Sequence, residues 1–153
     1  MKTYLSTHFE FEFQVNEQFI EAHYECGHDK ITRIRELMCH IINVQHIWIS
    51  RILNETQESE DSDDLPFHSW AKLNLDNQQQ IRFILHHYDI DSAISYTNSD
   101  GEHKTKSLVQ LLTHLLQHGA YHRGQINYLL RQHDLEPISC NWINFDMDNK
   151  SRG

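Results

Sequence analysis

The sequence predicts an all-α fold, an up-down four-helix bundle with a long connection between the second and third helices. Three observations support this prediction. The 153 residues include only two prolines and five glycines, which favours helices. Apolar side chains recur at spacings of three and four over four long segments, and polar, turn-forming segments separate them. At this length, residues 1–153 are expected to form one domain with a substantial core.

Residues 4–24 are expected to form the first helix. Phe9, Phe11, Phe13 and Val15 alternate with polar residues, which is typical of a strand. No turn signal closes a short strand here, and the polar residues that follow continue directly into a further apolar segment. Spacings of three and four are also satisfied, and these favour the helix. The residues with helical spacing are Leu5, Phe9, Phe13 (or Glu12), Asn16 and Ile20.

Residues 30–54 are expected to form the second helix. Gly27 suits the C-terminal cap of the first helix, and Asp29 can cap the second. His40 and His46 flank the apolar face of this helix on opposite sides, so periodicity alone does not choose between them as a metal ligand. The apolar face consists of Ile34, Leu37, Met38, Ile41, Val44, Trp48 and Ile52.

The connection over residues 54–66 is acidic and contains serine, so a solvated loop is expected. Its aspartates, Asp61, Asp63 and Asp64, resemble the start of a calcium-binding loop. The glycine and the distal glutamate of an EF-hand loop are missing, and the calcium interpretation is therefore rejected.

The third helix is expected over residues 75–95, and residues 97–105 form a turn-rich connection. Pro137 follows the end of the fourth helix, and Trp142 and Phe145 in the tail are expected to pack back onto the bundle. The apolar members of the third helix are Leu75, Ile81, Ile84, Leu85, Tyr88 and Ile94.

The fourth helix, expected over residues 107–131, carries the most informative pattern. His118 and His122 lie on its apolar stripe, four residues apart, so their imidazoles project from one face. Two histidines on a core stripe cost free energy unless their nitrogens are satisfied, and a metal ion would satisfy them. The apolar members of the stripe are Leu108, Leu111, Leu115, Ile126 and Leu129.

Composition excludes several functional classes. The net charge of −9 argues against nucleic-acid binding, which needs positive charge. No apolar run approaches the roughly 18–20 residues of a membrane span, and no signal peptide is recognisable. The three cysteines lack framework spacing, so free thiols and a cytoplasmic location are expected. The number of histidines, 13, is unusually high for a chain of this length. Histidine is the commonest metal ligand, so this number is consistent with metal binding.

Three segments of this chain carry recognisable motifs. Residues 118–126 match the pattern H-x-x-x-H-R-G-Q-[IV], which is fairly specific. Residues 40–51 resemble the segment H-I-x-x-[AV]-x-x-x-W-[LI]-x-R, and residues 130–145 resemble the tail L-R-x-x-G-x-x-P-x-x-x-D-x-I-x-F, from which they depart near its glycine and its aspartate. Together these motifs resemble those of the DinB-like family of damage-inducible helical-bundle metalloproteins. The resemblance covers nearly the whole chain in the right order.

The resemblance implies a four-helix bundle of DinB/YfiT-like type. It implies a divalent metal, zinc or nickel, held by His40, His118 and His122, and thereby favours His40 over His46. Such bundles often form homodimers. Related members include S-transferases that depend on a low-molecular-weight thiol, so a thiol and a small-molecule substrate are the expected partners.

Three residues after the second histidine have expected roles of their own. Gln125 can orient a ligand histidine or a bound water. Arg123 points away from the stripe and is expected to pair with a carboxylate at a helix or subunit contact. Gly124 in a helix interior costs about 1 kcal/mol relative to alanine, so a close helix contact is expected there.

The leading hypothesis is a metal-dependent enzyme. Three histidine ligands leave a coordination position open, where a thiol or water can be activated toward an electrophilic substrate. This describes an S-transferase or a hydrolase-like protein whose substrate is unknown. The alternative is a non-catalytic, stress-related metal-binding protein with the same ligands. A ferritin-like di-metal site needs Glu-x-x-His pairs on two helices, which the sequence does not supply.

Overall fold

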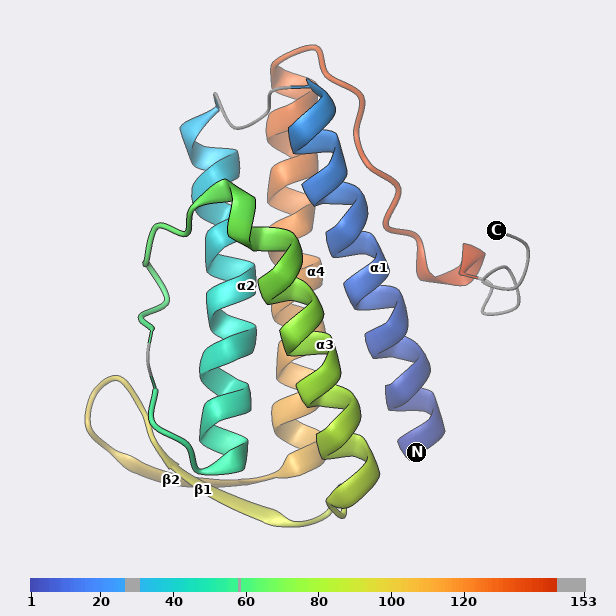
Figure 1. Ribbon diagram of the computed structural model, residues 1–153. Coiled ribbons are helices and arrows are strands. Elements are labelled where there is room, and N and C mark those ends of the chain that lie inside the picture. Colours follow the sequence, from blue (N-terminus) through green and yellow to red (C-terminus); the bar gives the residue numbers. More distant parts are fainter. Residues whose placement is uncertain (27–30, 58, 146–153) are drawn as a thin grey trace.

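The computed structural model describes residues 1–26, 31–57 and 59–145, and four long helices dominate these segments (Figure 1). The expected caps Gly27 and Asp29 lie outside the described residues. The helices are α1 (Lys2–Cys26), α2 (Thr32–Leu53), α3 (Trp70–His87) and α4 (Leu108–Gln132). The strands are β1 (Ala93–Thr97) and β2 (His103–Ser107), and single 3-10 turns occupy Phe67–Ser69 and Trp142–Asn144.

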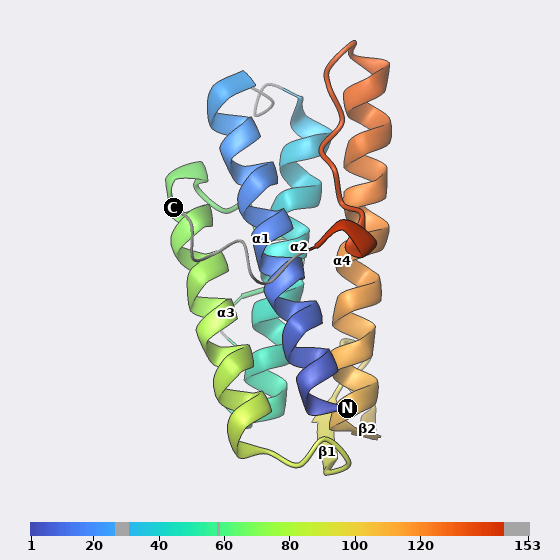
Figure 2. The ribbon, with the colours of Figure 1, turned by 90° about the vertical axis from the view of Figure 1, so that its right-hand side faces the viewer.

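The four helices lie lengthwise beside one another, as both views show (Figures 1 and 2). Helices α2 and α3 run in the same direction (Figure 1). The composition of the apolar core is consistent with this parallel orientation of α2 and α3. Ile34 and Trp70, near the starts of α2 and α3, share one apolar cluster, whereas Ile52 and Leu85, near their ends, share the other. The expected up-down alternation is therefore corrected, because the long connection spans the length of the helices.

Two apolar clusters fill the space between the helices, since each helix buries one apolar stripe. One cluster includes Phe13 and Ile49, and the other includes Phe19 and Met38. Buried polar side chains interrupt this core near the middle of α1 and the second half of α4. They include Glu12, Asn16, Asn43, Gln45, Asn74, Asn77, Arg123 and Asn127.

The third helix differs from its expected range of residues 75–95, and the all-α prediction misses a small sheet. Helix α3 begins at Trp70 and ends at His87, and residues 93–97 then pair antiparallel with residues 103–107. Gly101, with φ of +78°, closes the turn of this hairpin. The side-chain oxygen of Asn98 accepts backbone hydrogen bonds from Asp100 and Glu102, which stabilises that turn.

The C-terminal tail packs onto α1, as the aromatic residues predicted. The ring of Trp142 stacks on His8 with 3.8 Å between centroids. Phe145 contacts Phe11 with 5.4 Å between centroids. Within the described segments, no helix is both long enough and apolar enough to cross a membrane.

Candidate metal centre

Helix α4 presents His118 and His122 on one face over a single turn. The helix begins after Ser107, whose backbone N–H donates to the Gln110 side chain at 3.1 Å and so caps the first turn. It then continues without interruption through Gln132. The ring centroids of the two histidines are 4.4 Å apart, and both side chains are partly buried.

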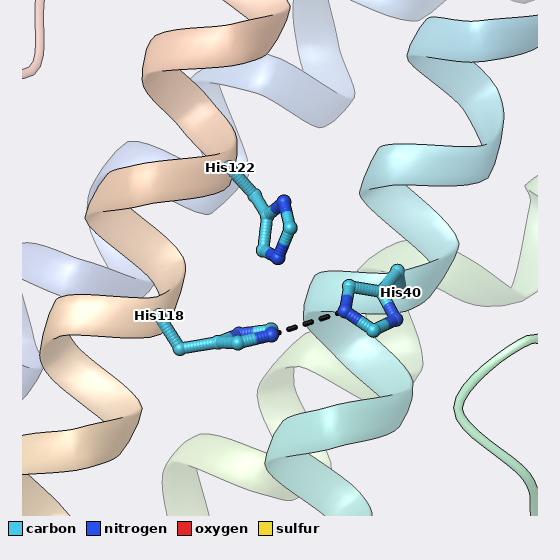
Figure 3. A group of neighbouring side chains, drawn as sticks. All are labelled: His40, His118 and His122. Atoms are coloured by element: carbon cyan, nitrogen blue, oxygen red, sulfur yellow. Dashed lines mark hydrogen bonds between the residues drawn. The ribbon is translucent and has the colours of Figure 1, made fainter.

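Helix α2 supplies the third imidazole, from His40. The Nε2 atoms of His40 and His118 are 3.0 Å apart, and His122 points toward the same space (Figure 3). One ring nitrogen from each of the three residues lies within 4.8 Å of the other two. His46 is not a member of this group. The structure thus brings together His118 and His122 with His40, the helix-2 histidine that the family resemblance favoured, and this group could hold a metal ion.

In His40 and His122, the Nδ1 atom is held by a hydrogen bond that determines which ring nitrogen is protonated. His40 donates from Nδ1 to the backbone carbonyl of Asp61 at 3.1 Å. His122 donates from Nδ1 to Oε1 of Gln125 at 2.7 Å, which is the orienting role expected for Gln125. Because both acceptors are oxygens, the Nε2 atoms keep their lone pairs and face one another. This arrangement is typical of metal-binding histidines.

The electrostatic environment lowers the pKa of His118 and of His122, which favours their neutral imidazoles. Burial, followed by the neighbouring His122 and His40, lowers the pKa of His118 to about 3. Burial also lowers the pKa of His122, although the hydrogen bond to Gln125 opposes that shift. A neutral imidazole is the form that coordinates metal, so neither residue has to lose a proton at neutral pH.

The geometry of the group fits a small divalent ion. A zinc–nitrogen bond of about 2.0–2.1 Å places two ligands of a tetrahedral site about 3.3 Å apart. The 3.0 Å separation between His40 and His118 is close to that value. Because no separation in the group exceeds 4.8 Å, small side-chain rotations suffice to bring all three nitrogens onto one ion. Three nitrogen donors leave at least one coordination position free for a further ligand.

A pocket of about 600 Å³ adjoins the three histidines. His40 and His122 form part of its wall, together with Arg33 and residues 61–64 of the acidic connection. The side chains of Asp61, Asp63 and Asp64 are exposed, as expected of a solvated loop. Its backbone is nevertheless fixed, because the buried Asn43 side chain donates to the Asp63 carbonyl at 2.8 Å. A small molecule in this pocket would therefore lie beside His40 and His122.

Arg123 pairs with a carboxylate, as predicted, and its partner is Glu12 on α1. Both side chains are 2% exposed. The close contact expected at Gly124 is wrong, since a side chain added there meets nothing within 4 Å. The close approach lies at Gly119 instead, where an added Cβ would come within 1.9 Å of Oε1 of Glu12.

Three contributors to the site were not recognised in the sequence. Glu12 had no assigned role in the site; Glu10 alternates with it among the same phenylalanines, so residue type alone does not single it out. The Asp61 carbonyl that orients His40 belongs to the backbone, so residue identity carries no signal for it. Gly119 was detectable in principle as a glycine inside a helix, directly after His118.

The geometry describes a helical protein with a group of three histidines suited to a metal ion. A comparison with protein-family models matches residues 5–150 to the DinB family. This match covers nearly the whole chain and confirms the resemblance, so the chain belongs to the DinB family. A comparison with curated proteins found no match.

Proposed function

We propose that this protein binds a divalent metal ion, zinc or nickel, through His40, His118 and His122. The observation that carries the proposal is the convergence of three ring nitrogens within 4.8 Å from two helices. The neutral state of His118 and the fixed tautomers of His40 and His122 support it. The lengthwise packing of four helices supports a bundle of DinB/YfiT-like type around this centre.

We further propose that the centre is catalytic. When bound, a divalent ion lowers the pKa of a coordinated thiol or water and so supplies a nucleophile at neutral pH. The chain holds His40 and His122 in place through Asp61 and Gln125, and the adjoining pocket admits an electrophilic small molecule. An S-transferase that uses a low-molecular-weight thiol, or a hydrolase-like reaction, is consistent with these features.

The test is elemental analysis of untagged, dialysed protein, followed by a screen for thiol-dependent turnover of electrophiles. About one zinc or nickel per chain would support the metal centre. No metal retention, even after metal is added back, would refute it. Metal retention without turnover in the presence of thiols would favour the alternative, a non-catalytic, stress-related metal-binding protein.

The homodimer expected from the family resemblance is also a proposal. The exposed face of α4 carries Tyr121 and Tyr128, which are 65% and 61% exposed. Two exposed tyrosines on one helix face are consistent with a protein contact. Sedimentation equilibrium of the metal-loaded protein would distinguish a dimer from a monomer.

A further inference from the structure

Arg51, on α2, differs from the other arginines of this acidic protein. It is half-buried, and no acidic partner for it lies in the part of the chain that the structure describes. Its Nε atom is buried without a hydrogen-bond partner, as are the Nε atoms of Arg35 and Arg123. Arg131 is exposed, and the remaining described arginines pair with carboxylates. Those paired arginines are Arg33, Arg35, Arg82 and Arg123. In a chain of net charge −9, a half-buried arginine without an acidic partner indicates an anionic ligand.

Two aromatic rings hold the Arg51 side chain in place. Its guanidinium carbon lies 4.9 Å from the ring centroid of Trp48 and 5.9 Å from that of Tyr96 on β1. The two rings contact each other edge to face, with 4.9 Å between centroids. Cation–π contact fixes the guanidinium without neutralising its charge, so its N–H groups remain available to a ligand.

This cluster adjoins the metal centre along the seam between α2 and α4. The Trp48 ring lies 5.4 Å from His114, and His114 lies 5.9 Å from His118, measured between centroids. Arg51 and His40 are separated by about three helical turns, so they lie on the same side of α2.

We propose that Arg51, held by Trp48 and Tyr96, binds the carboxylate of a planar, anionic small molecule whose other end faces the three histidines. This inference rests on the proposed function and specifies its substrate class. A single guanidinium fork matches the two oxygens of a carboxylate. The rings of Trp48 and His114 provide flat surfaces for the planar part of the ligand.

The test measures binding of 4-fluorobenzoate by fluorine NMR to the wild type and to Arg51→Gln. Loss of a charge-assisted, bidentate pair is expected to weaken binding about tenfold or more. Arg131→Gln, which removes an exposed arginine of α4, should bind like the wild type. Neutral 4-fluorobenzamide should bind the wild type far more weakly than the benzoate, and 4-fluorophenyl phosphate should not bind more tightly.

Three results would overturn the proposal: no binding of 4-fluorobenzoate to the wild type, equal affinity in Arg51→Gln, or tighter binding of the phosphate. Arg51→Lys, which keeps the charge and loses the fork, guards against a folding artefact. An intermediate affinity in Arg51→Lys, together with wild-type thermal unfolding, supports the direct contact. Wild-type affinity in Arg51→Lys contradicts recognition by the guanidinium fork.

An experiment with cobalt(II) distinguishes failure of this inference from failure of the proposed function. The binding comparison is made first in metal-free protein, where it does not depend on a metal. If cobalt binds, its paramagnetism should broaden the signal of the bound fluorobenzoate in the wild type. Arg51-dependent binding without broadening in cobalt-loaded protein would contradict the location beside the metal centre. Failure to bind cobalt at all would count against the metal centre alone.

Discussion

The guanidinium of Arg123 lies in the core against the carboxylate of Glu12, with Nη1 donating to Oε1 at 2.6 Å and Nη2 donating to Oε2 at 2.5 Å. Nη1 also donates to Asn16 at 2.9 Å, and Asn16 in turn donates to Asn74 on α3. Arg123 directly follows His122 on α4. The pair therefore fixes the rotation of α4 about its axis, which directs His118 and His122 toward α2.

Glu12→Gln should destabilise the protein by about 3–5 kcal/mol, because it leaves the buried guanidinium without a counter-charge. The measurement is urea unfolding of metal-free protein. Arg82→Gln is the matched control, since it breaks an ion pair with Glu10 in which the Arg82 side chain is 51% exposed. That change should cost about 1 kcal/mol or less. Equal losses of unfolding free energy in the two variants would show that the buried Arg123–Glu12 pair stabilises the protein no more than the exposed pair does.

The two glycines of α4 should respond in opposite directions to alanine. Gly119→Ala places a methyl group 1.9 Å from Oε1 of Glu12 and 2.9 Å from Nη1 of Arg123. It should cost about 1–3 kcal/mol through overpacking. Gly124→Ala meets no neighbour and should stabilise the protein by about 0.5–1 kcal/mol through helix propensity. Thermal unfolding of both variants measures the difference, and a stabilised Gly119→Ala would contradict the close contact.

The long helices could be predicted because their apolar residues recur over many turns. The hairpin could not be predicted in this way. Each of its strands has five residues, and Ile94 and Tyr88 satisfied helical spacing as well. The direction of α3 was also missed, since the length of a connection does not show which way it returns.

Half of the candidate metal centre follows from local sequence, because His118 and His122 share one helix and their spacing fixes their relative position. The choice between His40 and His46 depends on how α2 is rotated against α4. Periodicity could not settle it, and the family resemblance favoured His40. The error at Gly124 has the same origin, since the helix face that meets α1 depends on tertiary packing.

His118→Ala should abolish tight metal binding, whereas His46→Ala should leave it intact. The reason is that His118 belongs to the group of converging nitrogens and His46 does not. Zinc affinity of untagged variants, measured by competition with a chelating dye, tests this prediction. Equal losses from both substitutions would show that the wrong histidine of α2 had been assigned.

Gln125→Ala should weaken metal binding by about 10–100-fold, because Gln125 accepts the hydrogen bond that orients His122. The stability of metal-free protein should change little, since Gln125 is only partly buried. Gln117→Ala, at an exposed position of the same helix, is the control and should retain wild-type affinity. If Gln125→Ala also retains full affinity, the hydrogen bond does not contribute to the centre.

Acid should destabilise metal-free wild-type protein in part through His118. Its pKa is about 3 in the folded protein and 6.5 in the unfolded chain, so between these values the unfolded state binds more protons. The stability associated with neutral His118 is thus complete above pH 6.5 and is lost as the pH falls toward 3. In His118→Gln this contribution is absent, so its unfolding free energy should vary less with pH.

The measurement is urea unfolding of chelator-treated protein at a series of pH values between neutrality and the acid limit of folding. The difference between wild type and His118→Gln should shrink or reverse as the pH falls. His133→Gln, which replaces an exposed histidine at the end of α4, should follow a profile parallel to the wild type. A difference between wild type and His118→Gln that stays constant with pH would show that burial and the neighbouring histidines do not lower the pKa of His118.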